Sequence, residues 1–336
     1  MAMKSLMFFI YCFDFLNVYL PKQLGRSENT IASYIDTLTI LKRYIENECE
    51  LDICRFTFAD CTFDFIQSFL AWLGANGSSN STCNQRLAGI KGYLEYCAIQ
   101  DISINSVLMV IKRIRPLPVK RTIKPTLSEI QLKEIMQQAP DTYKGKRNRL
   151  ILLLLYETAM RVSEIVSVRV SDLHIARDIP YISIMGKGKK ERNIVISSKL
   201  ADILTIYLSR YHDPDVTYLF YSYLGGIGTP LSPRSVQTFL KTYADKAREY
   251  DSTIPLKVHP HMYRRSKATK LYQNGMALEL VSSFLGHSQL ETTRIYARPS
   301  MEMMRTEIEK SIPEEAYKVK PRWKNDKDFA SKLGLR

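Results

Sequence analysis

Apolar residues recur every three or four positions along most of the first hundred residues, which is the spacing of one face of an α-helix. The four clearest helices are expected over residues 9–22, 27–48, 63–73 and 81–96. The first of them is expected to end near Pro21, because proline cannot continue a helix. Small and polar residues over 74–81 predict a loop. Residues 1–111 are therefore predicted to form an all-helical domain of four to five short helices.

The pattern changes in the rest of the chain. Residues 112–125, KRIRPLPVKRTIKP, are basic, rich in proline and without an apolar period, which predicts an extended linker. Residues 150–156 follow a basic turn and are apolar on every side, which predicts a buried helix. Two short alternating segments joined by GKGKKE predict a β-hairpin over residues 181–185 and 192–196. We therefore expect a second, mainly helical domain with a small hairpin over residues 126–300, and a tail over 301–336.

The stretch from 257 to 298, KVHPHMYRRSKATKLYQNGMALELVSSFLGHSQLETTRIYAR, contains several helix signals. Pro260 suits the first turn of a helix, where its missing N–H would be unpaired anyway. An apolar pattern over residues 276–284 predicts a second helix, and Gly286 suits the position just after its end. Ser288 and Glu291 have the spacing of a capping box, which predicts the start of a third, short helix.

Four side chains of this stretch could surround one phosphodiester. His261 and Arg264 are three residues apart and therefore share one face of the helix that begins at Pro260. The N-terminus of that helix adds partial positive charge and free N–H groups, both of which favour an anion. His287 falls in the following turn, and Tyr296 presents a phenol near the end of the third helix.

The chain has 336 residues, which suits two domains, and a formal net charge of +14. Residues 1–115 carry equal numbers of acidic and basic side chains, so residues 116–336 carry the whole excess. A basic excess confined to one part of a chain indicates a surface that binds a polyanion. A basic face exposed to solvent is the alternative, and charge alone does not decide between them.

All six cysteines lie within the first hundred residues, and none forms a C-x-x-C pair or has a histidine at zinc spacing. This pattern predicts reduced, mostly buried thiols in a cytosolic protein. The apolar run over residues 6–13 superficially resembles a signal peptide, but Asp14 interrupts it and no small-residue cleavage site follows. We therefore expect a soluble, cytoplasmic protein with no membrane partner.

Three segments, AMRVSEI, HPHMYRRSKAT and LGHSQLETTRIYAR, closely resemble the tyrosine recombinases, the phage-integrase-like family. The family pattern is an Arg, a Lys, a His-x-x-Arg, a Gly-His, and a Tyr nine residues after that His. All five elements occur here in order, at Arg161, Lys187, His261, Arg264, His287 and Tyr296. The resemblance covers residues 9–300 and is tightest from residue 147 on.

The resemblance implies a helical, SAM-like core-binding domain and an integrase-like catalytic domain that close on DNA as a C-shaped clamp. The additional arm-site-binding domain of lambda-type integrases is expected to be absent. Tyr296 would attack a backbone phosphate and form a 3′-phosphotyrosine, with no metal or other cofactor and no ATP. Arg161 and Arg264 would neutralise the phosphate oxygens, and Lys187 in the hairpin would protonate the departing 5′-oxygen.

Two histidines and one carboxylate complete the implied site. His261 and His287 would donate or shuttle protons, and Glu164 would orient Arg161 or a neighbouring histidine. The implied partner is double-stranded DNA with specific recombination sites, bound by a homotetramer that an accessory recombination factor could assist. Such a protein would be associated with the nucleoid, and its tail would dock into a neighbouring protomer.

Three of the catalytic positions have neighbours of the same residue type, and the spacing of the motifs decides between them. It favours Lys187 over Lys189 and Lys190, His261 over His259, and Arg264 over Arg265. The family often has Leu and His on either side of the second Arg, where this chain has Tyr263 and Arg265, and this departure leaves local substrate contacts open. Further DNA contacts are expected from basic residues elsewhere: Arg86, Lys91, Lys120, Arg121, Lys189 and Arg265.

The biological role has alternatives. The departures beside Arg264 and the long tail favour integration or transposition of a mobile genetic element, and Xer-like resolution of chromosome or plasmid dimers is the alternative. A non-catalytic DNA-binding protein on the same scaffold is a further one, although every catalytic position is filled. Metal-dependent nucleases and transposases need clustered carboxylates to hold two Mg²⁺ ions, and we find none around these motifs.

Overall fold

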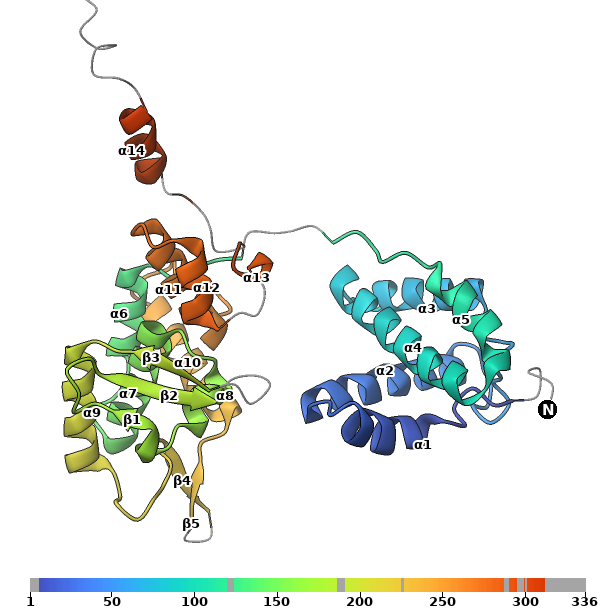
Figure 1. The fold of residues 1–336 in the computed structure, drawn as a ribbon, viewed down its shortest axis with the longest axis horizontal. Helices are drawn as coiled ribbons and strands as arrows, with labels where there is room; N and C mark the ends of the chain where they lie inside the picture. The colour runs from blue at the N-terminus through green and yellow to red at the C-terminus, as the bar shows by residue number, and fades with distance from the viewer. Residues whose placement is uncertain are drawn as a thin grey trace, which may run out of the picture. The chain divides into compact units, whose positions relative to one another are not determined.

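Figure 1 shows the computed structural model of the chain, which describes residues 6–119, 124–185, 191–224, 227–286, 290–294, 299 and 301–311. The chain divides into two compact units, Met1–Ile123 and Lys124–Arg336. The described elements are mostly helices with two small antiparallel sheets, which confirms the predicted fold class. Among the described residues, no helix is both long and apolar enough to cross a lipid bilayer.

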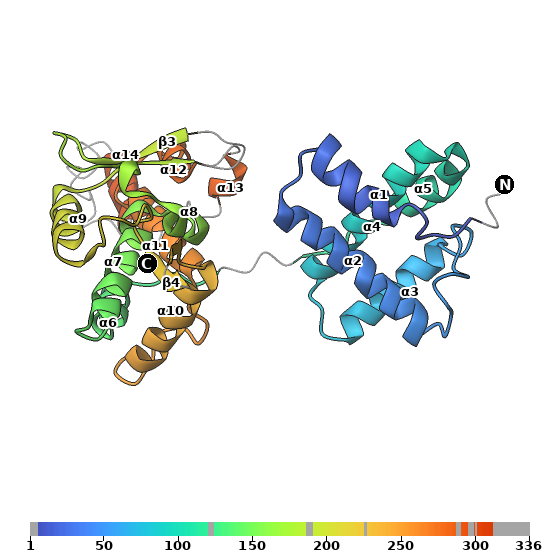
Figure 2. The ribbon, with the colours of Figure 1, turned by 90° about the horizontal axis from the view of Figure 1, so that it is seen from below.

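The described part of the first unit is helical. Its elements are α1 (Cys12–Asp14), the π-helix η2 (Phe15–Gln23), α2 (Glu28–Asn47), α3 (Phe63–Ala75), α4 (Asn80–Gln100), the 3₁₀-helix η3 (Ile102–Ile104) and α5 (Asn105–Lys112). Helix α4 contacts α2, α3 and α5 and so runs through the middle of the unit (Figures 1 and 2). The four predicted helices are therefore present.

Side-chain caps explain where the helices of the first unit begin. The hydroxyls of Ser27, Thr62 and Ser79 each accept a hydrogen bond from a backbone N–H three residues further on. Because Ser79 caps α4, the loop between α3 and α4 covers only residues 76–79 and is shorter than the predicted 74–81.

The first predicted helix forms as α1 followed directly by η2. It passes through Pro21 and ends at Gln23, one residue beyond the expected range of 9–22. The Leu24 N–H donates to the Tyr19 carbonyl at 2.9 Å, a bond across five residues that is typical of a π-turn. The wider π-turns thus allow the helix to continue past the proline.

The apolar run over residues 6–13 contributes to the core of the first unit. Phe8 has no exposed surface, and its ring lies 5.5 Å from that of Phe56 and 5.4 Å from that of Tyr93. The Tyr93 hydroxyl donates to the Phe8 carbonyl at 2.7 Å. This buried donor and acceptor satisfy each other within an aromatic core.

The first half of the predicted linker is folded onto the first unit, which corrects the expectation of an extended segment over 112–125. Ile114 is buried, with 2% of its surface exposed. Asn84 in α4 pairs with the backbone of Leu117 in both directions, since its amide donates to the carbonyl at 2.8 Å and its oxygen accepts from the N–H at 2.7 Å. The burial of Ile114 and the hydrogen bonds of the Asn84 amide therefore hold this segment on the first unit, although its composition predicts a free linker.

The second unit contains the remaining elements. Its described helices are α6 (Glu129–Gln137), α7 (Tyr143–Thr158), α8 (Val162–Ser167), the 3₁₀-helix η4 (Val170–Asp172), α9 (Ser198–Tyr211), α10 (Pro233–Arg248), α11 (Pro260–Gln273), α12 (Leu278–Leu285), α13 (Glu291–Arg294) and α14 (Met301–Ser311). Its described strands are β1 (Leu173–His174), β2 (Tyr181–Met185), β3 (Glu191–Val195), β4 (Tyr221–Leu224) and β5 (Ile227–Pro230).

The predicted hairpin is part of a three-stranded antiparallel sheet in the order β1-β2-β3. Ile182 pairs with Ile194, and both side chains are buried. Strand β3 begins one residue earlier than predicted, at Glu191. The hairpin of β4 and β5 is a second sheet that the sequence pattern did not predict.

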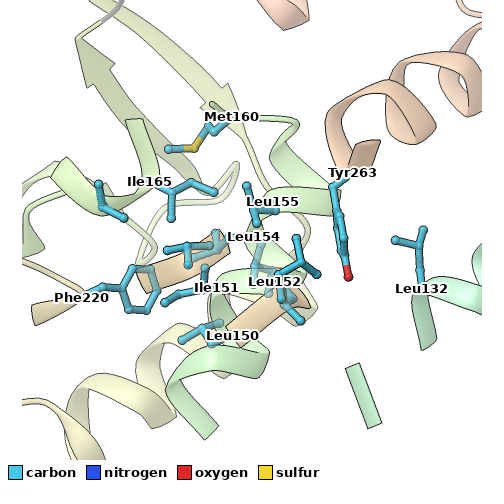
Figure 3. Packing of buried hydrophobic residues seen from close by; sticks show 14 of the residues in the cluster. Leu132, Leu150, Ile151, Leu152, Leu154, Leu155, Met160, Ile165, Phe220 and Tyr263 are labelled. Carbon is cyan, nitrogen blue, oxygen red and sulfur yellow. The ribbon is translucent and has the colours of Figure 1, made fainter. Parts of the chain in front are cut away.

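Helix α7 lies at the centre of the second unit. Figure 3 shows Leu150, Leu152 and Leu155 of this helix packed among the apolar side chains of neighbouring elements, including Leu132 of α6 and Tyr263 of α11. Each of these side chains has at most 5% of its surface exposed. The buried helix expected over 150–156 is therefore present.

Helix α7 begins earlier than expected, because residues 144–149 form its first turns and not a basic turn before it. The Thr142 hydroxyl caps the helix by accepting from the Gly145 N–H at 3.1 Å. Arg147 donates to the Tyr221 carbonyl at 3.0 Å, which holds this basic turn of the helix against strand β4.

Candidate active site

Arg161 lies between the central helix and the next one. Helix α7 ends at Thr158, and Ala159 then adopts the left-handed conformation (φ 50°) that turns the chain toward α8. The Arg161 N–H donates to Oε2 of Glu164 at 2.8 Å, and its Nη1 donates to Oε1 at 2.8 Å. The same carboxylate therefore starts α8 and fixes the arginine side chain.

Glu164 holds a second arginine as well. Its Oε2 accepts from Nη2 of Arg192 in strand β3 at 3.2 Å, and the glutamate side chain is only 7% exposed. Arg192 was not predicted as a site residue. A signal was present, because strand alternation places Arg192 on the same side as the buried Ile194. A charge on the buried face of a strand needs a partner.

Arg264 is almost fully buried in α11, with 2% of its surface exposed. Its Nη1 donates to the Ala159 carbonyl at 2.5 Å, and its Nη2 donates to the Leu285 carbonyl at 2.5 Å. These carbonyls belong to the ends of α7 and α12, where backbone acceptors have no partner within the helix. One guanidinium therefore connects the segment before Arg161 to the end of α12.

His261 lies in the first turn of α11, which begins at Pro260 as predicted. Desolvation and the nearby guanidinium groups of Arg264 and Arg161 lower the pKa of its imidazole below the usual value. The ring of His259 lies 6.5 Å away, and desolvation also lowers the pKa of that imidazole. The structure therefore brings His261, Arg264 and Arg161 together and favours neutral histidines beside the two cations.

The departures beside Arg264 have different structural consequences. Tyr263 has no exposed surface, and its side chain packs into the core of the second unit (Figure 3). Burial raises the pKa of its phenol. Arg265 is partly exposed and donates to the Pro125 carbonyl at 3.0 Å. Tyr263 is thus a packing residue, and Arg265 ties α11 to the start of the second unit.

Two described elements lie next to the predicted His287 and Tyr296 in the sequence. Gly286 follows α12 in the left-handed conformation (φ 64°), as the helix pattern predicted. Helix α13 then covers Glu291–Arg294. Several predicted site residues lie outside the described residues: Lys120, Arg121, Lys187, Lys189, His287 and Tyr296, together with the capping residue Ser288.

Arg86 and Lys91, the two predicted DNA contacts of the first unit, have internal partners. Arg86 donates to the Ser33 carbonyl at 3.3 Å and to the Thr37 hydroxyl at 3.2 Å, and so joins α4 to α2. Lys91 donates to the Ile114 carbonyl at 2.8 Å, just beyond the end of α5. Both side chains contribute to the packing of helices, and their contact with DNA stays a prediction.

Comparison with protein families gives two matches that cover most of the chain. The model of the "Phage integrase family" matches residues 125–303, and that of the "Phage integrase, N-terminal SAM-like domain" matches residues 14–100. Among solved structures, the XerH site-specific recombinase bound to a palindromic difH substrate has a TM-score of 0.65 and 22% identity, over 88% of this chain and 83% of its own. The Tn1549 transposon integrase bound to a circular intermediate DNA has a TM-score of 0.67 and 17% identity, over 88% of this chain and 98% of its own.

Proteins of known family are also similar along nearly their whole length. Tyrosine recombinase XerA of Thermococcus onnurineus is 31% identical over 287 residues, which are 85% of this chain and 90% of that protein. Tyrosine recombinase XerC of Chlamydia pneumoniae is 28% identical over 322 residues, which are 90% of this chain and 98% of that protein. The chain therefore belongs to the phage integrase family of tyrosine-type site-specific DNA recombinases.

Proposed function

We propose that this protein cuts and rejoins DNA at specific sites through a covalent 3′-phosphotyrosine, with Tyr296 as the nucleophile. The observation that carries this proposal is that the guanidinium groups of Arg264 and Arg161 both act on the imidazole of His261, while the buried Glu164 carboxylate holds Arg161 at 2.8 Å. Cations held in a partly desolvated site stabilise an anionic transition state more strongly than cations in water.

The chemistry is a direct exchange at phosphorus. The phenolic oxygen of Tyr296 attacks the phosphorus, its proton passes to a histidine, and the bond from phosphorus to the 5′-oxygen breaks. Lys187 gives the departing oxygen a proton, while Arg161 and Arg264 stabilise the charge on the non-bridging oxygens. A 5′-hydroxyl from the partner strand then attacks the phosphotyrosine, which releases Tyr296 and reseals DNA without metal or ATP.

The proposed assembly is a homotetramer on two double-stranded DNA sites, because each protomer cuts one strand and the exchange of two duplexes requires four cuts. An accessory recombination factor is part of this proposal where the isolated protein binds its site without cutting it. The proposed location is the nucleoid in the cytoplasm.

Two biological roles are proposed for this chemistry. Movement of a mobile genetic element is favoured by the likeness of fold to the Tn1549 transposon integrase, with a TM-score of 0.67. Resolution of chromosome or plasmid dimers is favoured by the similarity to Xer recombinases along 90% or more of their length. Sequencing of the covalently bound DNA decides between them, because the first role requires element ends and the second requires a fixed chromosomal or plasmid site.

The test of the chemistry is covalent trapping in excess EDTA. Wild-type protein and the Tyr296→Phe variant are mixed with labelled, nicked duplexes taken from DNA that flanks the gene. We expect a labelled band that survives SDS for the wild type and is absent for Tyr296→Phe. A band that persists in Tyr296→Phe means that another tyrosine is the nucleophile, and tight site-specific binding without a band supports the non-catalytic alternative unless a partner protein restores cleavage.

A further inference from the structure

Strand β3 carries an arginine that the catalytic set does not include. Arg192 follows the tip of the hairpin, and its side chain is 18% exposed. Its guanidinium has two neighbours from distant parts of the second unit. Nη2 lies 3.2 Å from Oε2 of Glu164, and a Cβ atom added at Gly286 would lie 1.9 Å from Nη1 and 2.6 Å from Cζ.

The contact with Gly286 is independent of the ion pair. A side chain at position 286 would overlap with the guanidinium, so the absence of a Cβ there leaves space for Arg192. Gly286 also has a φ of 64°, a conformation that glycine adopts without strain. The end of α12 therefore packs directly on Arg192. Gly286, at this end, is the residue immediately before His287 in the chain.

The carboxylate of Glu164 is shared by two arginines. The carboxylate is 7% exposed and lies between Nη1 of Arg161 at 2.8 Å and Nη2 of Arg192 at 3.2 Å. Two cations and one anion leave a net charge of one positive unit at this place. If Arg161 were the only partner, Glu164 would neutralise it, and less positive potential would remain for a phosphate.

We propose that Arg192 is a positioning residue for strand cleavage. It shares the charge of Glu164 and packs against Gly286, and so it fixes Arg161 and the end of α12 in their places. Lys187, the proposed general acid, lies five residues before Arg192 in the sequence. This inference rests on the proposed function and adds a residue that does not contact DNA itself.

A purely stabilising role does not account for this arginine. A buried ion pair is weak support for stability compared with apolar packing of the same volume. Nε of Arg192 is buried and has no hydrogen-bond partner among the described residues, which adds a cost. Neighbouring Ile194 shows that this face of the strand can carry an apolar side chain. Stability alone therefore does not explain an arginine at this position.

The test separates a charge effect from general damage by changing the charge of the substrate. Single-turnover cleavage is measured for wild type, Arg192→Met and Arg192→Lys on the nicked site found in the trapping experiment. Two versions are compared, one with a normal scissile phosphate and one with a neutral methylphosphonate. Arg169→Met is the matched control, because it removes one exposed charge from the same unit. DNA affinity and thermal unfolding are measured for every variant.

With the normal phosphate, we expect Arg192→Met to cleave about 10- to 100-fold more slowly than wild type, because a small misplacement of a clamp costs that much. DNA affinity should match that of Arg169→Met, whereas the midpoint of thermal unfolding should be lower than that of the control, because the buried Glu164 loses one partner. With the methylphosphonate, the ratio of wild-type to variant rates should fall to about 3 or less, since a neutral phosphate gains little from a second positive charge.

Two results would overturn the proposal. The first is a cleavage rate for Arg192→Met equal to that of wild type, and the second is the same loss of rate on both substrates. If Arg192→Met does not fold, Arg192→Lys decides, because the ammonium keeps the charge but lacks the planar fork. We then expect a loss on the normal phosphate that shrinks on the methylphosphonate. Absence of covalent product with wild type would instead contradict the proposed function.

Discussion

At the scale of single residues, Arg264 has an unusual position for a residue expected to meet DNA. Its guanidinium is buried, and it donates to one carbonyl at the end of α7 and one at the end of α12. Helix C-termini carry partial negative charge, so a cation there is stabilised. Arg264 therefore supports the fold in addition to its proposed place in the catalytic set.

We predict that Arg264→Met lowers the free energy of unfolding of the second unit by about 2–4 kcal/mol, because two buried carbonyls lose a charged donor. Urea unfolding followed by circular dichroism measures this change. Arg264→Lys is the control, since its single ammonium cannot reach both carbonyls in the same geometry. We expect an intermediate value for it, and stability equal to wild type in both variants would exclude this bridging role.

The pKa of His261 gives a second prediction at this scale. Desolvation and the guanidinium groups of Arg264 and Arg161 lower it, so the folded state binds a proton less readily than the unfolded chain. The group therefore contributes full stability above the unfolded value of about 6.5, and this contribution is lost as pH falls through the folded value.

NMR titration of the free protein should give a midpoint below about 6.5 for the His261 ring. His261→Asn identifies its signals. Arg265→Met should raise the midpoint, because Arg265 is one of the charges that lower it. A normal midpoint that Arg265→Met leaves unchanged would show that these cations do not act on the ring.

The sequence predicts Arg161, His261 and Arg264 in one candidate site, His261 and Arg264 from their spacing and Arg161 from the family resemblance. It did not reveal that Arg264 bonds to the ends of two helices, since its acceptors, Ala159 and Leu285, are backbone groups from distant segments. Arg192 was missed for a similar reason. Its partners are distant in sequence, and a single charged residue in a strand is usually exposed.

At the scale of elements, local chemistry decided several boundaries. The apolar pattern placed the buried part of α7 correctly but missed its basic first turns, because the Thr142 cap starts the helix seven residues before the apolar run. The hairpin of β4 and β5 has no strong alternation and was not predicted. Helix patterns with a clear end signal, such as Gly286 after α12, were placed well.

The start of α7 provides a prediction about an element. Gly145→Ala should destabilise the second unit by about 1–3 kcal/mol, although Ala usually favours a helix over Gly, because the new Cβ would lie 1.9 Å from the Pro140 carbonyl oxygen. Gly74→Ala in α3 is the control, since nothing lies within 4 Å of its Cβ position. We expect the control to be neutral or stabilising in thermal unfolding. A stabilising effect of both substitutions would show that the backbone at Pro140 can move.

At the scale of the whole molecule, the chain has separate hydrophobic cores in its two units. We therefore predict two transitions in urea unfolding, each sensitive to substitutions in one unit only. Tyr93→Phe removes the donor to the Phe8 carbonyl and should lower the stability of the first unit by about 1–2 kcal/mol. Gly145→Ala should move only the other transition, and a common shift for both variants would show that the units unfold as one.

The two-part organisation was visible in the sequence, because the basic excess is confined to the second part and the motifs lie there as well. The sequence did not show that residues 112–118 dock on the first unit. This docking depends on hydrogen bonds of Asn84 and on the burial of Ile114. Composition identifies a linker, but only tertiary contacts show how much of it is free.

The bonds of Arg264 to the ends of α7 and α12 have a consequence for the safety of the cell. A nuclease-like activity that appeared in a half-made protein would break chromosomes at random. Here Arg264 takes its place only when two helices far apart in sequence have both formed and met. With the proposed role of Arg264, DNA breakage therefore begins only after the second unit has folded.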